Sequence, residues 1–262
     1  MAVRRSAGRT TGGLAGLGLQ TVSTDCYRQV KDRLRDLIDK LGVEGTLRLP
    51  SEAALSEALG VSRATLRSAL QSLQKEGRIR RLQGSGTFIN RHALNLGPNL
   101  AEAGAFMDLL AEVGYAPSMR MVNQSVVPLA DDVAASLELP EGARGLRIER
   151  VFGASGKPAV HSVDIFPVDE LGEHPEKLDP TRSTFDFVET HMDAPVCYSV
   201  AEVRPVLPPA EIARTLRVSA GQPLLRLRHT HVRSDERPAA VTTVHINDEY
   251  LRFNVIRTNL DE

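Results

Sequence analysis

The chain has 262 residues, of which 42% are apolar and 25% charged, a composition that suits one large or two ordinary folded domains and excludes an intrinsically disordered chain. Its two cysteines, Cys26 and Cys197, are too few for a disulfide framework or a four-cysteine zinc site, so we expect reduced thiols in a cytoplasmic protein that needs no metal and no cofactor. No apolar run reaches the length of about 18 residues that a membrane span requires.

The net charge of −1 hides an uneven distribution of charge along the chain. Residues 1–92 carry 16 basic and 8 acidic side chains, whereas the remaining residues carry 16 basic and 25 acidic ones. A basic front part suits a polyanionic partner such as nucleic acid, and an acidic remainder indicates a separate task. Charge alone leaves open two solvated faces of unequal charge, so the motifs must decide.

We interpret residues 1–24 as a disordered basic tail. Three arginines precede a short Gly-rich apolar stretch, a pattern that also occurs in twin-arginine export signals. The stretch is interrupted by Gly16 and Gly18, and no small-x-small cleavage site follows it. These features favour a tail over an export signal.

The next elements in the chain are predicted to be three helices. Apolar residues recur at helical spacing up to Leu41, and Gly42 is expected to end the first helix. Ser51 is placed to cap a short second helix, which Gly60 closes. Ser62 is placed to cap a third, whose inward residues would be Leu66, Ala69, Leu70 and Leu73. The second and third helices, joined by a glycine-containing turn, predict a helix-turn-helix.

A β-hairpin with a glycine-rich tip is predicted over residues 79–89, in the position of a wing. The first turns of the third helix offer Arg63, Thr65 and Arg67, and an arginine there can read guanine O6 and N7 in the major groove. The helix N-termini at Ser51 and Ser62 offer phosphate contacts. This arrangement predicts a DNA-binding module.

Four segments carry a resemblance to a known family: residues 49–52, 59–70, 76–79 and 84–88. In this order they resemble the winged helix-turn-helix of GntR-family transcriptional regulators, over residues 25–90. The resemblance implies that Arg63, Thr65 and Arg67 read DNA, with Gln83 and Gly84 at the wing. Many family members carry an arginine where this chain has Ala53, so that contact to DNA is not expected here.

Residues 91–99 are predicted to be a linker, because Gly97-Pro98 interrupts any periodicity. Residues 100–262 then form a second domain, which begins with a helix that ends at Gly114. A pattern that starts at Val127 recurs 79 or 80 residues later, and each copy predicts strand, short helix, strand, turn and strand. We therefore expect one sheet built from two pseudo-symmetric halves with helices against it, an α+β fold.

This second domain resembles the UTRA effector-binding domain, which defines the HutC subfamily of GntR regulators and has the chorismate-lyase fold. The repeated unit carries the resemblance together with residues 114–117, 183–185 and 248–253. The resemblance implies that a small molecule, often an anionic sugar phosphate, binds between strands.

An arginine next to helix N–H groups is what an anion requires. Arg150 aligns with a phosphate-binding arginine of the family, and Ser183 and Thr184 begin a predicted helix, so we expect a phosphorylated or carboxylated effector. Two alternatives stay open: Arg150 pairs with Glu149 or Glu202 between strands, and Ser183 only caps its helix. The candidate effector-binding residues are Arg150, Phe152, Ser162, Ser183, Thr184, Phe185 and His245.

Family members that sense amino-sugar phosphates tend to have a second arginine where this chain has Phe152, so glucosamine-type ligands are not expected. His161, His229, His231 and His245 also allow a metal cluster as an alternative. We expect them instead on polar strand faces or along the pocket.

Taken together, these features predict a homodimeric transcriptional repressor that binds a palindromic operator in double-stranded DNA and answers to a small effector, without catalytic residues and without a membrane. One alternative is a DNA-binding protein with a vestigial pocket. The other is an enzyme, because the fold of the second domain has a lyase relative, but the sequence offers no obvious acid/base or nucleophile pair.

Overall fold

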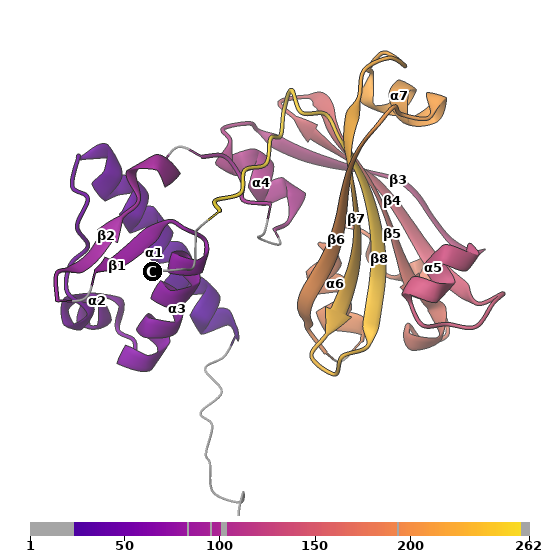
Figure 1. The fold of residues 1–262 in the computed structure, drawn as a ribbon. Coiled ribbons are helices and arrows are strands. Elements are labelled where there is room, and N and C mark those ends of the chain that lie inside the picture. The colour runs from indigo at the N-terminus through magenta and orange to yellow at the C-terminus, as the bar shows by residue number, and fades with distance from the viewer. Residues whose placement is uncertain (1–23, 83, 95, 101–103, 193, 258–262) are drawn as a thin grey trace, which may run out of the picture. The chain divides into compact units, whose positions relative to one another are not determined.

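The computed structural model of the protein describes residues 24–257 apart from Gln83, Asn95, residues 101–103 and Asp193, and it leaves the side chains of residues 24–28 undescribed. The predicted basic tail lies outside the described residues, and so does the alternative of an export signal. The described part of the chain divides into two compact units (Figure 1): residues 24–94 with Arg257 form the first, and the described residues up to Ile256 form the second.

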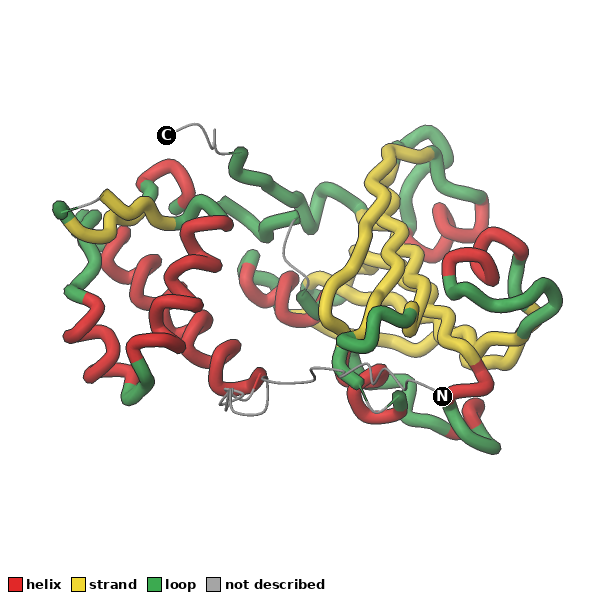
Figure 2. Tube along the Cα trace, turned by 60° about the horizontal axis from the view of Figure 1, so that its bottom comes forward, coloured by secondary structure: helices red, strands yellow, loops and turns green. Residues whose placement is uncertain are grey.

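The first unit is a three-helix core with a β-hairpin (Figure 2). Its elements are α1 (Thr24–Val43), α2 (Glu52–Leu59), α3 (Arg63–Lys75), β1 (Ile79–Leu82), β2 (Gly86–Ile89) and the 3-10 turn η1 (Arg91–Ala93). The apolar stripe predicted for the third helix is buried against the other helices and the hairpin, at Leu66, Ala69, Leu70 and Leu73. The predicted winged helix-turn-helix is confirmed.

Gly42 does not end the first helix, contrary to the prediction. The helix continues to Val43, and the left-handed conformation occurs at Gly45, where φ is 76°. Gly42 is instead a packing position, because a Cβ there would lie 2.6 Å from the side chain of Leu94. The glycine therefore lets a neighbouring segment approach the helix closely.

The second unit is a six-stranded antiparallel sheet with short helices on both faces. Its helices are α4 (Phe106–Glu112), α5 (Asp131–Ser136), α6 (Thr184–His191) and α7 (Ala210–Leu216), with 3-10 turns η2 (Val168–Glu170) and η3 (Pro175–Lys177). Its strands are β3 (Pro117–Pro128), β4 (Arg144–Ala154), β5 (Lys157–Pro167), β6 (Val196–Val206), β7 (Leu224–Arg233) and β8 (Pro238–Ile246). The strand order is β3-β4-β5-β8-β7-β6.

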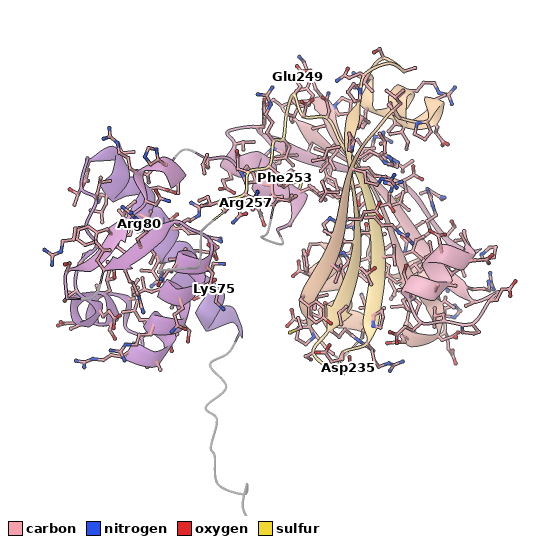
Figure 3. All side chains as sticks on the ribbon, viewed as in Figure 1. Lys75, Arg80, Asp235, Glu249, Phe253 and Arg257 are labelled. Carbon is pink, nitrogen blue, oxygen red and sulfur yellow. The ribbon has the colours of Figure 1, made fainter. Side chains whose placement is uncertain are left out.

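The predicted internal repeat is confirmed by this topology. The first copy is β3-α5-β4-β5 and the second is β6-α7-β7-β8. The two copies meet where β5 pairs with β8 at the centre of the sheet. Figure 3 shows Asp235, in the β7–β8 turn, and Glu249, just after β8, at opposite ends of the strands.

The helices cover the two faces of this sheet in pairs. On one face, α4 packs with Phe152 and Leu227, and α6 packs with Ile148 and Phe166. On the other face, α5 packs with Val241, and α7 lies against β5. Because α4 and α6 cover different parts of their face, the strand surface between them is left for a pocket.

Among the described residues, no helix is both long enough and apolar enough to cross a membrane.

Candidate functional site

Two serine caps fix the starts of the helices in the helix-turn-helix. Ser51 Oγ accepts a hydrogen bond from the Ala54 backbone N–H at 3.2 Å, and Ser62 Oγ accepts one from the Thr65 N–H at 3.1 Å. Gly60 ends α2 with a φ of 66°, a left-handed conformation that favours glycine. These contacts are the ones that the sequence predicts, and they set where α3 begins.

The first turns of α3 expose Arg63 and Arg67. They stand four residues apart, so they lie on one face of the helix, opposite the buried stripe. Thr65 does not belong to this face: it is buried, and its hydroxyl lies 2.8 Å from Ser62 Oγ. The predicted role of Thr65 as a DNA reader is therefore corrected to a role in the helix cap, because residues two apart on a helix point in different directions.

Glu52 holds two arginines at the surface, which the sequence did not reveal. Arg67 Nε donates to one carboxylate oxygen at 2.8 Å, and Arg81 Nη2 donates to the other at 3.1 Å. The hydrogen bond from Arg67 holds the pKa of Glu52 below its usual value, against the effect of burial. Because Arg67 binds through Nε, its two terminal nitrogens stay available for other acceptors.

The hairpin β1–β2 has the expected wing shape, and its tip is braced by a residue outside it. Arg48 Nη2 donates to the Ser85 carbonyl at 2.8 Å, and its guanidinium lies 5.8 Å from the centre of the Phe88 ring. Gly84 is exposed with a φ of 75°, as a tight tip requires. The other predicted wing residue, Gln83, lies outside the described residues.

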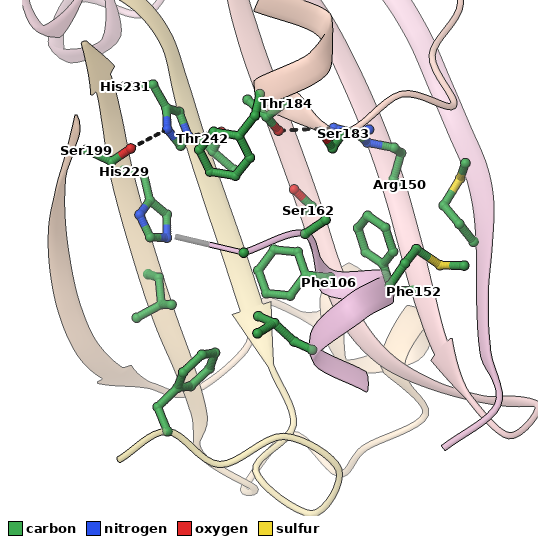
Figure 4. Close-up of a pocket in the computed structure, with 18 of the residues that line it drawn as sticks. Phe106, Arg150, Phe152, Ser162, Ser183, Thr184, Ser199, His229, His231 and Thr242 are labelled. Carbon is green, nitrogen blue, oxygen red and sulfur yellow. Dashed lines mark hydrogen bonds between the residues drawn. The ribbon is translucent and has the colours of Figure 1, made fainter. Parts of the chain in front are cut away.

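A pocket of about 180 Å³ lies in the second unit, on the face that α4 and α6 cover (Figure 4). This space is far larger than the ~10–15 Å³ that one water molecule needs. Six of the seven predicted effector residues line it: Arg150, Phe152, Ser162, Ser183, Thr184 and Phe185. Ser183 also caps α6 through the Asp186 N–H, so the capping alternative describes a contact that it does make.

His245 is the seventh, and its prediction as an effector residue is wrong. Thr242 in the same strand lines the pocket, and side chains alternate between faces along a strand, so His245 lies on the opposite face. There it stands across from His161, with ring centres 6.1 Å apart. The strand register, which the sequence does not give, decides the face.

Arg150 is paired with a carboxylate, but with neither of the two that the sequence suggested. Its Nη2 donates to Asp164 Oδ2 at 2.5 Å, and both side chains are buried. Glu149 instead accepts from Arg147 and contacts His161, and Glu202 accepts from Arg226. The partner is Asp164 because it lies on the neighbouring strand and on the pocket side of the sheet.

Asp164 is the centre of a buried hydrogen-bond cluster. The hydroxyls of Thr184 and Thr242 each donate to its Oδ1 at 2.7 Å, and Ser162 donates to its Oδ2 at 3.2 Å. Burial alone would raise the pKa of Asp164, but the charge and hydrogen bond of Arg150 and the hydroxyl donors hold it below the usual value. Asp164 is therefore an ionised carboxylate whose acceptor sites are filled.

Two histidines of β7 extend this cluster toward β6. His231 Nε2 lies 2.9 Å from Thr242 Oγ1, and its Nδ1 lies 2.7 Å from Ser199 Oγ. Burial, together with the neighbouring His229, lowers the pKa of His231 to about 4, and burial also lowers the pKa of His229. Both rings are therefore neutral near pH 7, and they are stacked with centres 5.6 Å apart.

Both of these histidines line the pocket, which is one of the two positions expected for them from the sequence. Among the described residues, no group of three or more His, Cys, Asp or Glu side chains is placed to hold a metal ion. Sequence reasoning missed Asp164, Ser199, Thr242 and Phe106. The period-2 pattern of their strands could have placed the first three on one face, but only after the register was known.

The model of the UTRA domain matches residues 112–252, more than half of the chain, and the model of bacterial regulatory proteins of the gntR family matches residues 26–89. The chain belongs to the GntR-family regulators with a UTRA domain.

Among curated proteins, this GntR/UTRA chain is similar to the HTH-type transcriptional repressor NagR of Bacillus subtilis. The two are 27% identical over 232 residues, which cover 85% of this chain and 94% of NagR. It is also 29% identical to the histidine utilization repressor of Pseudomonas putida over 206 residues. These residues cover 77% of this chain and 80% of that protein. Among solved structures, YydK of Bacillus subtilis shares the fold, with a TM-score of 0.67 at 18% identity over 88% of this chain and 99% of YydK.

The curated relatives are transcriptional repressors and not enzymes, so the lyase-like alternative is set aside. The GntR/UTRA chain is a transcriptional repressor of the GntR/HutC type, with a DNA-binding first unit and an effector-binding second unit.

Proposed function

We propose that this repressor binds a palindromic operator as a homodimer in the cytoplasm and that a small molecule in the UTRA pocket controls its release. The observation that carries the operator proposal is the exposed pair Arg63 and Arg67 on the first turns of α3. Two guanidinium groups on one helix face, four residues apart, can contact successive base edges in a major groove.

The remaining predicted contacts are assigned to the DNA backbone. Ser51 and Ser62 are exposed at helix N-termini, where anions are favoured, so they are proposed to contact phosphates. The wing tip at Gln83 and Gly84 is proposed to approach the backbone or the minor groove. These contacts position α3 but carry no sequence information of their own.

Two observations support the dimer: a single α3 helix reads a short stretch of DNA, and one edge of the sheet is exposed. One α3 helix reads only a short half-site, so a two-fold pair of chains is needed for a longer operator. Strand β6 is an edge strand, and its Tyr198, Val200 and Val203 are exposed. Exposed apolar edge strands are a liability unless another chain covers them, and a second copy would do so.

The effector is proposed to be a small molecule held between α4 and α6. The sequence favours an anion because of Arg150, but that arginine is already paired with Asp164. The chemistry of the ligand is therefore a separate question from its site. A pocket lined by an ordered polar cluster also supports a responsive sensor over the vestigial-pocket alternative.

The test is operator binding by Arg67→Ala, with Lys75→Ala as the control. Lys75 is an exposed cation on the same helix, but it lies at the C-terminal end of α3 (Figure 3). We expect Arg67→Ala to weaken binding to DNA from the protein's own locus by roughly 5- to 150-fold, equal to about 1–3 kcal/mol for a lost base contact, with Lys75→Ala near wild type.

The same titration reports the number of chains on each operator, and two are expected. Sequence-selective binding that survives in Arg67→Ala would contradict the role of this residue. Wild-type protein that shows no salt-sensitive, sequence-selective binding at all would contradict the proposed operator function.

A further inference from the structure

The polar end of the pocket has no net charge. Among the described residues that line it, Arg150 is the one cationic side chain, and the buried Asp164 carboxylate compensates it. His229 and His231 are neutral near pH 7 because burial lowers the pKa of each. A charged ligand would therefore enter this space without a free counter-charge.

The guanidinium of Arg150 has few hydrogens left for a ligand. Its Nη1 donates to the carbonyls of Pro180 and Arg182, and its Nη2 donates to Asp164 and Thr184. The remaining nitrogen, Nε, is buried and has no hydrogen-bond partner among the described residues. An anion that took the place of Asp164 on Arg150 would leave that carboxylate buried without its counter-charge, which is strongly unfavourable.

The hydroxyl groups of the pocket also donate their hydrogens to other groups of the protein. Each hydroxyl has one hydrogen, and an ionised carboxylate only accepts, so a hydroxyl bonded to it must donate. All six lining hydroxyls donate elsewhere: Ser162, Thr184 and Thr242 to Asp164, Thr181 to Asp179, Ser183 to Asp186, and Ser199 to His231.

The direction of the Ser199 bond follows from the same count. Thr242 donates its hydroxyl hydrogen to Asp164. In its contact with His231 it must therefore accept, and His231 Nε2 carries the hydrogen. The neutral His231 then has a bare Nδ1, which accepts from Ser199. The hydroxyl oxygens at the polar end therefore have only lone pairs to offer, and they form a row of acceptors.

The other end of the pocket is aromatic (Figure 4). The rings of Phe106 and Phe152 lie 5.4 Å apart at 45° to each other, and both belong to an apolar cluster that also contains Leu227 and Met119. Such a cluster favours a flat apolar group, because aromatic rings contribute contact area and a preferred geometry.

We infer that the effector is an uncharged molecule with a flat apolar part against Phe106 and Phe152 and with hydroxyl or N–H groups that donate to the acceptors of the polar end. This inference rests on the proposed function, and it replaces the anionic effector that the sequence favours. Alcohols and glycosides of aromatic or heteroaromatic rings belong to this class, whereas phosphorylated sugars do not.

The first experiment compares three probes of similar size on the wild-type protein without DNA. These are 4-hydroxybenzyl alcohol, 4-hydroxybenzoate and phenyl phosphate, each at millimolar concentration, with binding measured by saturation-transfer NMR and by thermal shift. We expect the alcohol to bind at least about tenfold more tightly than either anion. Tighter binding of an anion overturns the inference, and so does the absence of binding by all three.

A matched pair of variants in β8 locates the binding. Thr242 faces the pocket, and its neighbour Thr243 lies on the other face of the sheet. Thr242→Val keeps the shape of the side chain but removes one hydroxyl oxygen from the acceptors of the polar end, so we expect the alcohol to bind about fivefold more weakly. Thr243→Val should bind the alcohol as wild type does. Equal affinities in the two variants would place the probe elsewhere and overturn the assignment.

Asp164→Asn removes the carboxylate that compensates Arg150 and should therefore favour an anionic probe. The variant leaves Arg150 without its counter-charge, so phenyl phosphate should gain at least about tenfold in affinity. A folded Asp164→Asn protein that still rejects phenyl phosphate would contradict the inference. If this variant does not fold, the probe selectivity of the wild type decides alone.

Operator binding by the same wild-type preparation separates the two levels of the proposal. Selective operator binding combined with a preference for the anions refutes the ligand class only. Loss of selective operator binding, as measured in the Arg67 experiment, refutes the proposed function itself.

Discussion

Arg67 and Arg150 show how burial decides what an arginine–carboxylate pair can do. The Arg67 side chain is 62% exposed beside Glu52, whereas Arg150 is 4% exposed beside Asp164, which has no exposure. An exposed pair contributes little to stability, so Arg67 can exchange Glu52 for a DNA partner at small cost. A buried pair cannot lose one partner without leaving an isolated charge. The first arginine is therefore available to a ligand, and the second organises the site.

The neutral histidines predict a loss of stability in mild acid. Burial lowers the pKa of His231 to about 4, below the unfolded value of about 6.5. Between these two values the unfolded chain binds a proton that the folded chain does not, so the free energy of unfolding falls as pH is lowered from about 6.5 toward 4. His245, whose pKa burial also lowers to about 4, adds to this effect.

Urea unfolding at about pH 7 and about pH 5.5 checks the sign, since the carboxylates with lowered pKa values titrate below this range. His231 contributes up to roughly 1.4 kcal/mol per pH unit. His231→Gln should show a smaller decrease than wild type, and His174→Gln, which changes an exposed histidine, should keep the wild-type decrease. Equal pH dependence in His231→Gln and wild type would rule out His231 as a source.

At the scale of elements, the start of α3 depends on one hydroxyl. Ser62 accepts the Thr65 N–H and also pairs with the buried Thr65 hydroxyl. Ser62→Ala should therefore cost about 1 kcal/mol at this helix terminus. Ser68→Ala, an exposed change inside the same helix, should be neutral or slightly stabilising, because alanine has the higher helix propensity.

Hydrogen exchange of the α3 amides in the full chain measures this difference. Faster exchange in the first turns of Ser62→Ala, with normal exchange in Ser68→Ala, is the expected result. Equal protection in the two variants would mean that packing of the buried stripe alone holds the helix in place.

The elements also show how far the sequence could lead. Periodicity and caps such as Ser62 and Ser183 are local signals, and they predicted α2, α3, α6 and the repeat of the sheet. The partner of Arg150 and the face of His245 depend on strand register, which follows from packing across the whole sheet. For the same reason the polar cluster around Asp164 could not be assembled from the sequence.

For the whole molecule, the two tasks differ in their dependence on charge. The basic excess lies in residues 1–92, and binding of DNA by such a module weakens steeply with salt because counterions are released. The pocket pairs its charges internally and, by our inference, holds an uncharged ligand. Effector affinity should therefore respond little to salt over a range in which operator affinity changes by orders of magnitude.

The two activities of the molecule must be coupled reciprocally if the effector controls the operator. A coupling free energy of about 1–3 kcal/mol changes each affinity by roughly 5- to 150-fold, and by the same factor in both directions. We expect the uncharged probe to weaken operator binding, and the operator fragment to weaken probe binding equally, whereas a DNA fragment of unrelated sequence at the same salt concentration should have a smaller effect.

Titration of the probe with and without each fragment, and of operator with and without probe, gives both factors. A probe affinity that the operator leaves unchanged would revive the vestigial pocket, because a ligand with equal affinity for two states shifts neither. Two equal factors that differ from one would show that each ligand changes the affinity for the other to the same extent, as thermodynamic linkage between the two sites requires.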